Sequence, residues 1–151
     1  MNDIPERDTG LTIEHFLPTE VPDVWQEVAD MLKRAIDLSG GRYAMNQTLH
    51  ELLLGKTTLW VVKDGEEIIA AWVLRLIEFP GRKTLYGDLL AGDRMKEWAH
   101  LMDEAVQDWA RKFRCDYVEI GGRDGWLRFA KPYGYEKAYW VMEKKVEYNE
   151  D

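Results

Sequence analysis

The residues best placed for chemistry lie in the run Leu89-Leu-Ala-Gly-Asp93, where a predicted strand leads into a predicted helix that begins near Arg94. The first N–H groups of a helix have no partner within it, and the positive end of the helix dipole lies beside them, so such a junction attracts phosphate. Here the sequence supplies its own anion. As the N-cap, Asp93 would stabilise the helix by about 1 kcal/mol. The junction is therefore either closed by this carboxylate or still open to a phosphorylated cofactor.

The only concentration of basic residues in the acidic chain surrounds Trp126, with Arg123, Arg128 and Lys131 close by in sequence. A tryptophan among cations can stack on a base or pack against a partner protein, so these four residues are a candidate interaction surface. The alternative is an ordinary amphipathic turn, in which Trp126 and Phe129 face inward and the charges are solvated.

The histidines and the cysteine give no sign of a metal site or of a nucleophile. His15, His50 and His100 lie on different predicted elements. His100 and Asp103 share a helical face, but two ligands do not make a metal site, so we expect no metal. Cys115 is the only cysteine, which rules out an intrachain disulfide, and it has no histidine partner in sequence. We therefore expect a packed thiol rather than a nucleophile.

Composition limits the class of protein. The chain has 151 residues, 46% of them hydrophobic, and we expect a flexible leader over residues 1–10 and a single domain over residues 11–148. The formal net charge of -8 argues against a broad nucleic-acid or anionic-membrane surface. No apolar run reaches the roughly 18 to 20 residues of a membrane span, and the N-terminus lacks the apolar core of a signal peptide. These features favour a cytoplasmic protein that is not secreted by a signal peptide.

Hydrophobic periodicity and turn signals predict the elements that position these residues. A helix is predicted from Thr19 or Pro22 to the Ser39-Gly40-Gly41 stop, and a second helix is predicted with Asn46 as its cap. Asp64-Gly65 marks a hairpin turn, and a long amphipathic helix is predicted from Arg94 to Phe113. The other predicted elements are strands over residues 11–16, 57–62, 67–77, 83–90, 117–120 and 139–146, and a short helix over residues 125–131.

This order of elements resembles that of the GNAT superfamily, the acyl-coenzyme A dependent N-acyltransferases, across nearly the whole chain. The best local support is the segment from Cys115 to Tyr135, which looks like the family's strand, short helix and Gly-aromatic ending. The resemblance implies an α+β, GNAT-like fold, with a mixed, mostly antiparallel central sheet flanked by helices on both faces. Three runs also look like those of small GNAT-like proteins of tailed phages and prophages: Leu59-Trp-Val-Val-Lys-Asp-Gly-Glu66, Gly92-Asp-Arg-Met-Lys-Glu-Trp98 and Gly122-Arg-Asp-Gly-Trp126.

The resemblance implies a donor site at the strand-to-helix junction. Active members bind the pyrophosphate of acetyl-CoA through a motif of the form Arg/Gln-x-x-Gly-x-Gly/Ala, and residues 88–94 retain only one of its glycines. The carboxylate of Asp93 stands where positive potential is needed, and two negative groups about 4 Å apart cost roughly 1 to 4 kcal/mol. A reduced cradle would consist of Leu90, Ala91, Gly92, Asp93 and Arg94.

The resemblance also implies an acid and a base. Many members protonate the departing thiolate with a tyrosine four residues before the Gly-aromatic pair, a position that Ala130 occupies here. The candidate acids are therefore Tyr133 and Tyr135, although both suit packing as aromatics. Members commonly use a strand carboxylate as general base, which points to Glu119, with Asp88 as the second choice. The alternative for Glu119 is an exposed carboxylate with no catalytic role.

The resemblance, together with the departures from the family's motifs, leaves two functions open. The first is a phage-encoded protein on a degenerate GNAT scaffold, with no cofactor, which serves in the virion or binds a phage or host protein through its basic and aromatic surface. The second is an active N-acetyltransferase that uses acetyl-CoA to modify an amine of a small molecule or a protein. The poor match of the two motifs favours the first. In either case we expect no nucleic-acid partner and no membrane segment, in the host cytoplasm or the phage virion.

Overall fold

The computed structural model describes residues 10–121, 124–139 and 141–149, with side chains described from residue 127 onward in the second of these ranges. The chain divides into two units, one ending at Gly121 and the other following it. The first unit carries the sheet and the three longer helices, and the described part of the second carries a short α-helix and a 3-10 turn. The single domain expected over residues 11–148 stays a prediction.

The first unit is built on one mixed sheet of five strands in the order β1-β2-β3-β4-β5. Neighbouring strands are antiparallel from β1 to β4, whereas β4 and β5 are parallel. The hairpin between β2 and β3 turns at Gly65, whose φ of +63° suits a glycine. The strands are β1 (Leu11–Phe16), β2 (Thr58–Asp64), β3 (Glu67–Phe79), β4 (Arg82–Gly92) and β5 (Tyr117–Ile120).

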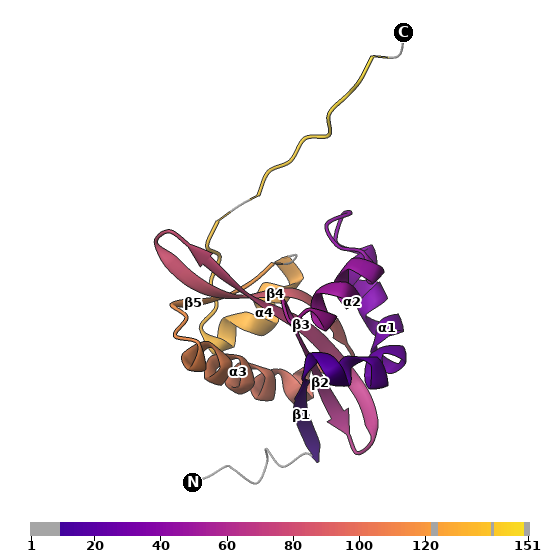
Figure 1. Ribbon diagram of the computed structural model, residues 1–151. Coiled ribbons are helices and arrows are strands. Elements are labelled where there is room, and N and C mark those ends of the chain that lie inside the picture. Colours follow the sequence, from indigo (N-terminus) through magenta and orange to yellow (C-terminus); the bar gives the residue numbers. More distant parts are fainter. Residues whose placement is uncertain (1–9, 122–123, 140, 150–151) are drawn as a thin grey trace. The chain divides into compact units, whose positions relative to one another are not determined.

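Helices cover both faces of this sheet (Figure 1). Helices α1 (Val21–Asp37) and α2 (Met45–Leu53) pack on one face, and α3 (Met95–Lys112) packs on the other, where it connects β4 to the parallel β5. A 3-10 turn, η2 (Pro18–Glu20), precedes α1. The α+β architecture expected from the sequence, with a mixed, mostly antiparallel sheet between helices, is confirmed.

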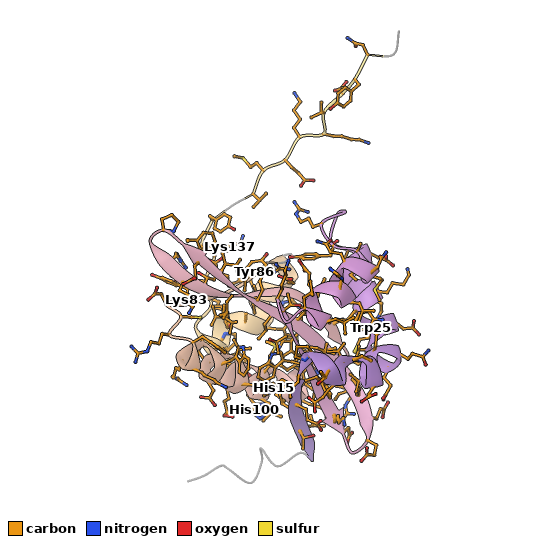
Figure 2. All side chains as sticks on the ribbon, viewed as in Figure 1. His15, Trp25, Lys83, Tyr86, His100 and Lys137 are labelled. Atoms are coloured by element: carbon orange, nitrogen blue, oxygen red, sulfur yellow. The ribbon has the colours of Figure 1, made fainter. Side chains whose placement is uncertain are left out.

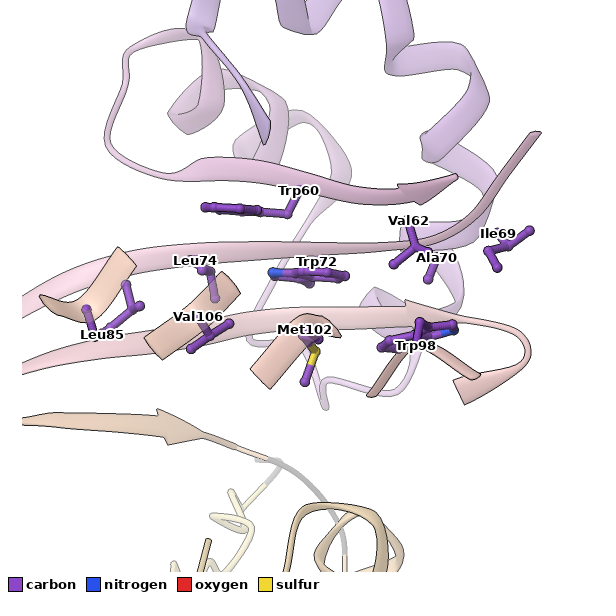
Figure 3. Packing of buried hydrophobic residues seen from close by; sticks show 11 residues of the cluster. Trp60, Val62, Ile69, Ala70, Trp72, Leu74, Leu85, Trp98, Met102 and Val106 are labelled. Carbon is purple, nitrogen blue, oxygen red and sulfur yellow. The ribbon is translucent and has the colours of Figure 1, made fainter. Parts of the chain in front are cut away.

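Tryptophans fill the core on the α3 face (Figure 3). The ring of Trp72 lies parallel to those of Trp60 and Trp98, with centroids 6.2 and 6.0 Å away. Trp109 meets Trp60 edge-on at 5.1 Å. Aromatic pairs at these separations add to the stability that burial alone provides. The tryptophans along α3, Trp98 and Trp109, therefore pack in the core and are not a platform for stacking on a nucleobase.

A bulge interrupts the pairing of β3 with β4. Val73 is paired with Leu89 and Leu74 with Gly87, so Asp88 is an extra residue on β4. Gly87 is also the last β4 residue paired with β5, opposite Ile120, although β4 continues to Gly92. The bulge and the end of the parallel pairing therefore coincide.

Two predictions about elements are wrong, one about a helix cap and one about a final strand. Helix α2 begins at Met45 with Ala44 as its N-cap, so Asn46 lies inside the helix and does not cap it. In the second unit, α4 (Asp124–Ala130) is followed by η3 (Lys131–Tyr133), but no strand forms at Tyr139 or over residues 141–149. Alternating apolar and charged residues favour a strand there, but a strand needs a hydrogen-bonded neighbour, and none of the described strands pairs with this segment.

Gly92 allows the end of β4 to lie close to β3, and this generates a prediction. A Cβ at Gly92 would lie 2.5 Å from the Cα of Ala70, and the φ of +146° is strained for other residues. We expect Gly92→Ala to lower the free energy of unfolding by about 2 to 4 kcal/mol, measured by chemical denaturation. Gly81→Ala is the matched control, because nothing lies within 4 Å of its added Cβ. Equal stability of the two variants would contradict the steric role of Gly92.

Candidate functional site

The junction between β4 and α3 differs from the one predicted. The N-cap of α3 is Arg94, in the left-handed conformation (φ 62°, ψ 37°), and no side chain caps the helix. The prediction that Asp93 is the N-cap is therefore wrong. Its carboxylate is 70% exposed, with the Nη1 of Arg34 at 3.8 Å. Strand β4 extends two residues further than predicted, to Gly92, and α3 begins only at Met95, after Asp93.

The backbone of Asp93 is committed to the fold. Its N–H donates to the carbonyl oxygen of Ile69 at 2.9 Å, and its carbonyl oxygen accepts from the Nε1 of Trp98 at 2.6 Å. Leu90, Ala91 and Gly92, the other expected cradle residues, are β4 residues opposite β3. Of the five, only Asp93 and Arg94 lie between the strand and the helix. The positive pole of α3 remains without a side-chain cap, which leaves it able to attract an anion.

Two carboxylates hold the side chain of Arg94. Its Nη1 lies 2.8 Å from the Oδ2 of Asp64, at the end of β2. Its Nη2 and Nε donate to the two oxygens of Glu97 in the first turn of α3, at 2.8 and 3.0 Å. The hydrogen bonds with Glu97 and then Asp64 raise the pKa of Arg94, and the same contact lowers the pKa of Glu97. The cation at the junction is thus already paired.

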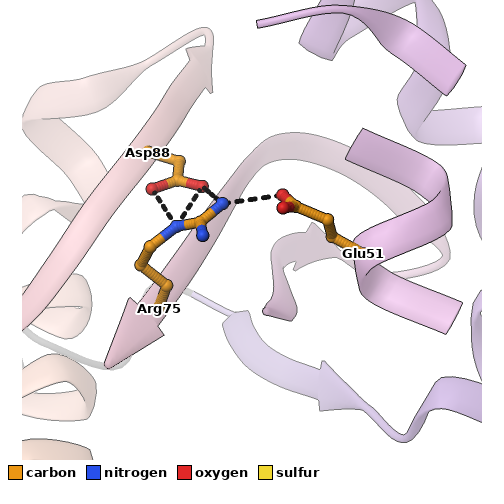
Figure 4. A network of polar contacts seen from close by, with 3 residues as sticks. All are labelled: Glu51, Arg75 and Asp88. Carbon is orange, nitrogen blue, oxygen red and sulfur yellow. Dashed lines mark hydrogen bonds and ion pairs between the residues drawn. The ribbon is translucent and has the colours of Figure 1, made fainter. Parts of the chain in front are cut away.

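A second polar cluster lies at the bulge (Figure 4). The Nε of Arg75 donates to both oxygens of Asp88 at 2.9 Å, and its Nη2 donates to the Oδ2 at 2.7 Å. The same Nη2 donates to the Oε1 of Glu51 on α2 at 2.7 Å. The Asp88 side chain is only 3% exposed. One guanidinium therefore connects a buried carboxylate on β4 to a half-buried one on α2.

Burial governs the proton affinity of this cluster. It raises the pKa of Asp88, although the hydrogen bonds and charge of Arg75 oppose the shift. Burial, and then the charge of Asp88, raises the pKa of Tyr43, which precedes α2. Asp88 is thus a carboxylate that binds a proton more readily than a solvated one.

Glu119, the candidate base from the sequence, lies on β5. Val118 and Ile120 pack with the α3-face core, which confirms that Glu119 points to the opposite face, the face that carries Arg75 and Glu51. Its Oε2 lies 3.2 Å from the Nη2 of Arg82. That guanidinium also stacks on the ring of Tyr117, 3.4 Å from its centroid. The role of Glu119 as a base stays a prediction, and the ion pair competes with it.

A small cavity lies where β4 and β5 part on the α3 side. Its volume is about 30 Å³, room for about one water molecule. Gly87 and Asp88 border it from β4, Ile120 from β5 and Met102 from α3. The cavity and the Asp88 cluster therefore meet at the same point of β4.

The remaining candidate residues belong to the second unit. Tyr133 ends η3 and is 38% exposed, and the side chains of Arg128 and Lys131 are exposed. Arg123 and the side chain of Trp126 lie outside the described residues. The acid role of Tyr133 and the interaction surface around Trp126 stay predictions.

The three histidines belong to different elements, with His50 on α2 and with His15 on β1 and His100 on α3, both labelled in Figure 2. Among the described residues, no three His, Cys, Asp or Glu side chains are grouped so as to hold a metal ion. None of the helices in the described part of the chain combines the length and the apolar run needed to cross a bilayer.

Sequence reasoning missed Arg75, Glu51 and Tyr43. Arg75 did leave a signal, because it is the one charged residue within residues 68–77 of a strand that is otherwise apolar. A charge in such a strand must be paired when it is buried. The sequence does not reveal its partners, since Glu51 is 24 residues away on another element.

No family model matches the sequence, and no curated protein matches it. The structure, in contrast, resembles solved acetyltransferases. An aminoglycoside acetyltransferase from an uncultured soil metagenomic sample, in complex with sisomicin, has a TM-score of 0.69 at 14% identity, covering 93% of this chain and 99% of that one. AAC(6')-Iy, in complex with the bisubstrate analog CoA-S-monomethyl-acetylneamine, has a TM-score of 0.69 at 12% identity, covering 91% and 98%.

A third neighbour is a predicted acetyltransferase from Clostridium acetobutylicum, solved with acetyl-CoA. Its TM-score is 0.66 at 14% identity, over 89% of this chain and 96% of that one. The chain therefore has the fold of the GNAT acetyltransferases, as the resemblance implied. All three neighbours are acetyltransferases, and none of them supports the expected phage or virion role.

The pairing of Arg75 with Asp88 generates a prediction. Arg75→Met leaves a buried carboxylate without its cation, so we expect a loss of about 3 to 5 kcal/mol in unfolding free energy near pH 7, measured by urea denaturation. The pKa of Asp88 in the folded state then rises further above its unfolded value. The folded state therefore binds the proton more readily, and stability falls as pH increases from the unfolded pKa to the raised folded pKa.

The loss in Arg75→Met should accordingly be smaller near pH 5 than near pH 8. Arg111→Met is the control, because its pair with Asp108 is exposed at the surface of α3. We expect that variant to stay within about 0.5 kcal/mol of the parent. A loss in Arg75→Met that does not change with pH would argue against an ionised Asp88.

Proposed function

We propose that this chain is an acyl-CoA-dependent N-acyltransferase that transfers an acetyl group to an amine. The observation that carries the proposal is the β4 bulge at Asp88. It brings a buried carboxylate and the parting of two parallel strands to one point. Fold neighbours solved with acetyl-CoA and with a CoA bisubstrate analog support a thioester donor.

The residues at the α3 junction suit the diphosphate of such a donor. Helix α3 has no side-chain cap, and Arg94 supplies a guanidinium at the same place. Phosphate groups bind at helix N-termini and pair with arginine. The exposed carboxylate of Asp93 opposes this attraction. Acetyl-CoA, when bound, supplies the activated acyl group, and the cavity beside Gly87 must widen to admit more than a water molecule.

We assign Asp88 as the general base that accepts a proton from the acceptor amine. An amine attacks a thioester only in its neutral form, so a nearby carboxylate must take its proton. A carboxylate with a raised pKa performs this task better than a solvated one, and burial raises the pKa of Asp88. Arg75 is a positioning residue, because it fixes both oxygens of Asp88. Glu119 is the second candidate base, on the same face of the sheet.

One observation favours the alternative, a non-enzymatic protein on the same scaffold. The junction has a single glycine, Gly92, which the close approach of Ala70 already requires. Arg94 is neutralised by two carboxylates, and Asp93 adds a third nearby. In that function, in a virion or against a host protein, the surface formed by Arg123, Trp126, Arg128 and Lys131 would bind the partner.

Ligand binding separates the two functions. If acetyl-CoA binds, a concentration of a hundred times its dissociation constant adds about 2.7 kcal/mol of apparent stability, which a thermal shift detects. The absence of a shift at millimolar acetyl-CoA would favour the non-enzymatic protein.

Substitution of the base tests the site. We expect Asp88→Asn to bind acetyl-CoA and to lower kcat for acetyl transfer by about 10²- to 10⁴-fold. The assay uses a panel of amines that includes sisomicin. Asp108→Asn is the control for loss of a carboxylate, since Asp108 lies exposed on α3. A full rate in Asp88→Asn, together with a large loss in Glu119→Gln, would transfer the base role to Glu119.

A further inference from the structure

The contacts of Arg94 join two parts of the chain that are 30 residues apart. Asp64 belongs to the β2–β3 hairpin and Glu97 to the first turn of α3, and Arg94 spans both from a left-handed backbone conformation. The side chain makes three hydrogen bonds, with lengths between 2.8 and 3.0 Å. All three use carboxylate oxygens as acceptors, the same kind of acceptor that a phosphate offers.

A diphosphate at the start of α3 would meet these carboxylates. A guanidinium can serve two anions, but its charge is shared, and unpaired carboxylates repel a phosphate at short range. The carboxylate of Asp93 lies 3.8 Å from the Nη1 of Arg34, which is long for an ion pair. A donor therefore gains the full attraction of Arg94 only when Asp64 and Glu97 release it.

We propose that Asp64 and Glu97 are internal competitors of the donor diphosphate for Arg94. This inference rests on the proposed function. Donor binding exchanges two carboxylates for phosphate and breaks the ion pair between Arg94 and Asp64, while the hydrogen bond from the Asp93 N–H to Ile69 still holds β3 to the start of α3. The exchange lowers the affinity for acetyl-CoA and keeps the junction closed to weaker anions such as inorganic phosphate.

Titration calorimetry on the full chain tests the exchange, with three ligands that differ in their phosphates. Coenzyme A and dephospho-coenzyme A both carry the diphosphate, whereas S-acetylpantetheine lacks it. The variants are Asp64→Asn, Glu97→Gln and the double variant. Asp108→Asn is the matched control, because it removes an exposed carboxylate that pairs with an arginine three residues away, as Glu97 does.

We expect the double variant to bind both diphosphate ligands about tenfold more tightly than the parent chain, and each single variant about threefold. Affinity for S-acetylpantetheine should not change, and Asp108→Asn should match the parent with every ligand. We expect Arg94→Gln to weaken only the diphosphate ligands. Circular dichroism verifies that each variant folds.

The remaining outcomes overturn the inference in distinguishable ways. If the parent binds coenzyme A and the double variant binds it no more tightly, the competition is absent while the proposed function stands. If S-acetylpantetheine or the Asp108→Asn control shows the same gain, the effect is general electrostatics and not exchange at Arg94. If neither the parent nor any variant binds coenzyme A, the proposed function fails and the inference fails with it.

Discussion

The bidentate pairing of Arg75 with Asp88 allows a charged carboxylate to be buried at the β4 bulge. A carboxylate that is 3% exposed is stable as an ion only when a cation and several donors face it. The bulge gives β4 the extra residue that carries this carboxylate, and Arg75 leaves its strand toward the same face. Because Arg75 also donates to Glu51, the pairing ties α2 to β3 and β4. The acceptor side of the proposed site depends on these three side chains holding each other.

The start of α3 shows how structural and binding demands compete for the same groups. Gly92 and the N–H of Asp93 serve the contact of β4 with β3, and the carbonyl of Asp93 receives the indole of Trp98. What remains for a ligand is the uncapped first turn and the guanidinium of Arg94. Solved acetyltransferases share the fold at only 12 to 14% identity, and a shared fold does not by itself establish a shared function. The activity must therefore be argued from the two polar clusters and not from the fold.

Much of the fold could be predicted from sequence because the relevant signals are local. The hairpin at Gly65 and the amphipathic pattern of α3 were both read correctly. Strands β3 and β4 run two residues further at Phe79 and Gly92 than the pattern indicated, since ladder pairing extends them. The predicted strand over residues 139–146 is wrong, because alternation supplies propensity but no partner. Of the candidate site, Asp88 was predicted only as a second choice, and Asp93 was predicted at the N-cap position that Arg94 occupies.

The sequence by itself determined the order of the elements from β1 to α4, the apolar faces of the helices and the strands, and the absence of an intrachain disulfide, because each depends on residue type and short spacing. Only the tertiary structure decided which charges meet. Arg75 finds its partners 13 and 24 residues away, and Arg94 finds Asp64 30 residues away. Such pairs depend on strand register and on the bulge, which shift by single residues without any trace in local periodicity. Ion pairs depend on distance in space and not on distance in sequence, so these charged groups meet only after the sheet has formed.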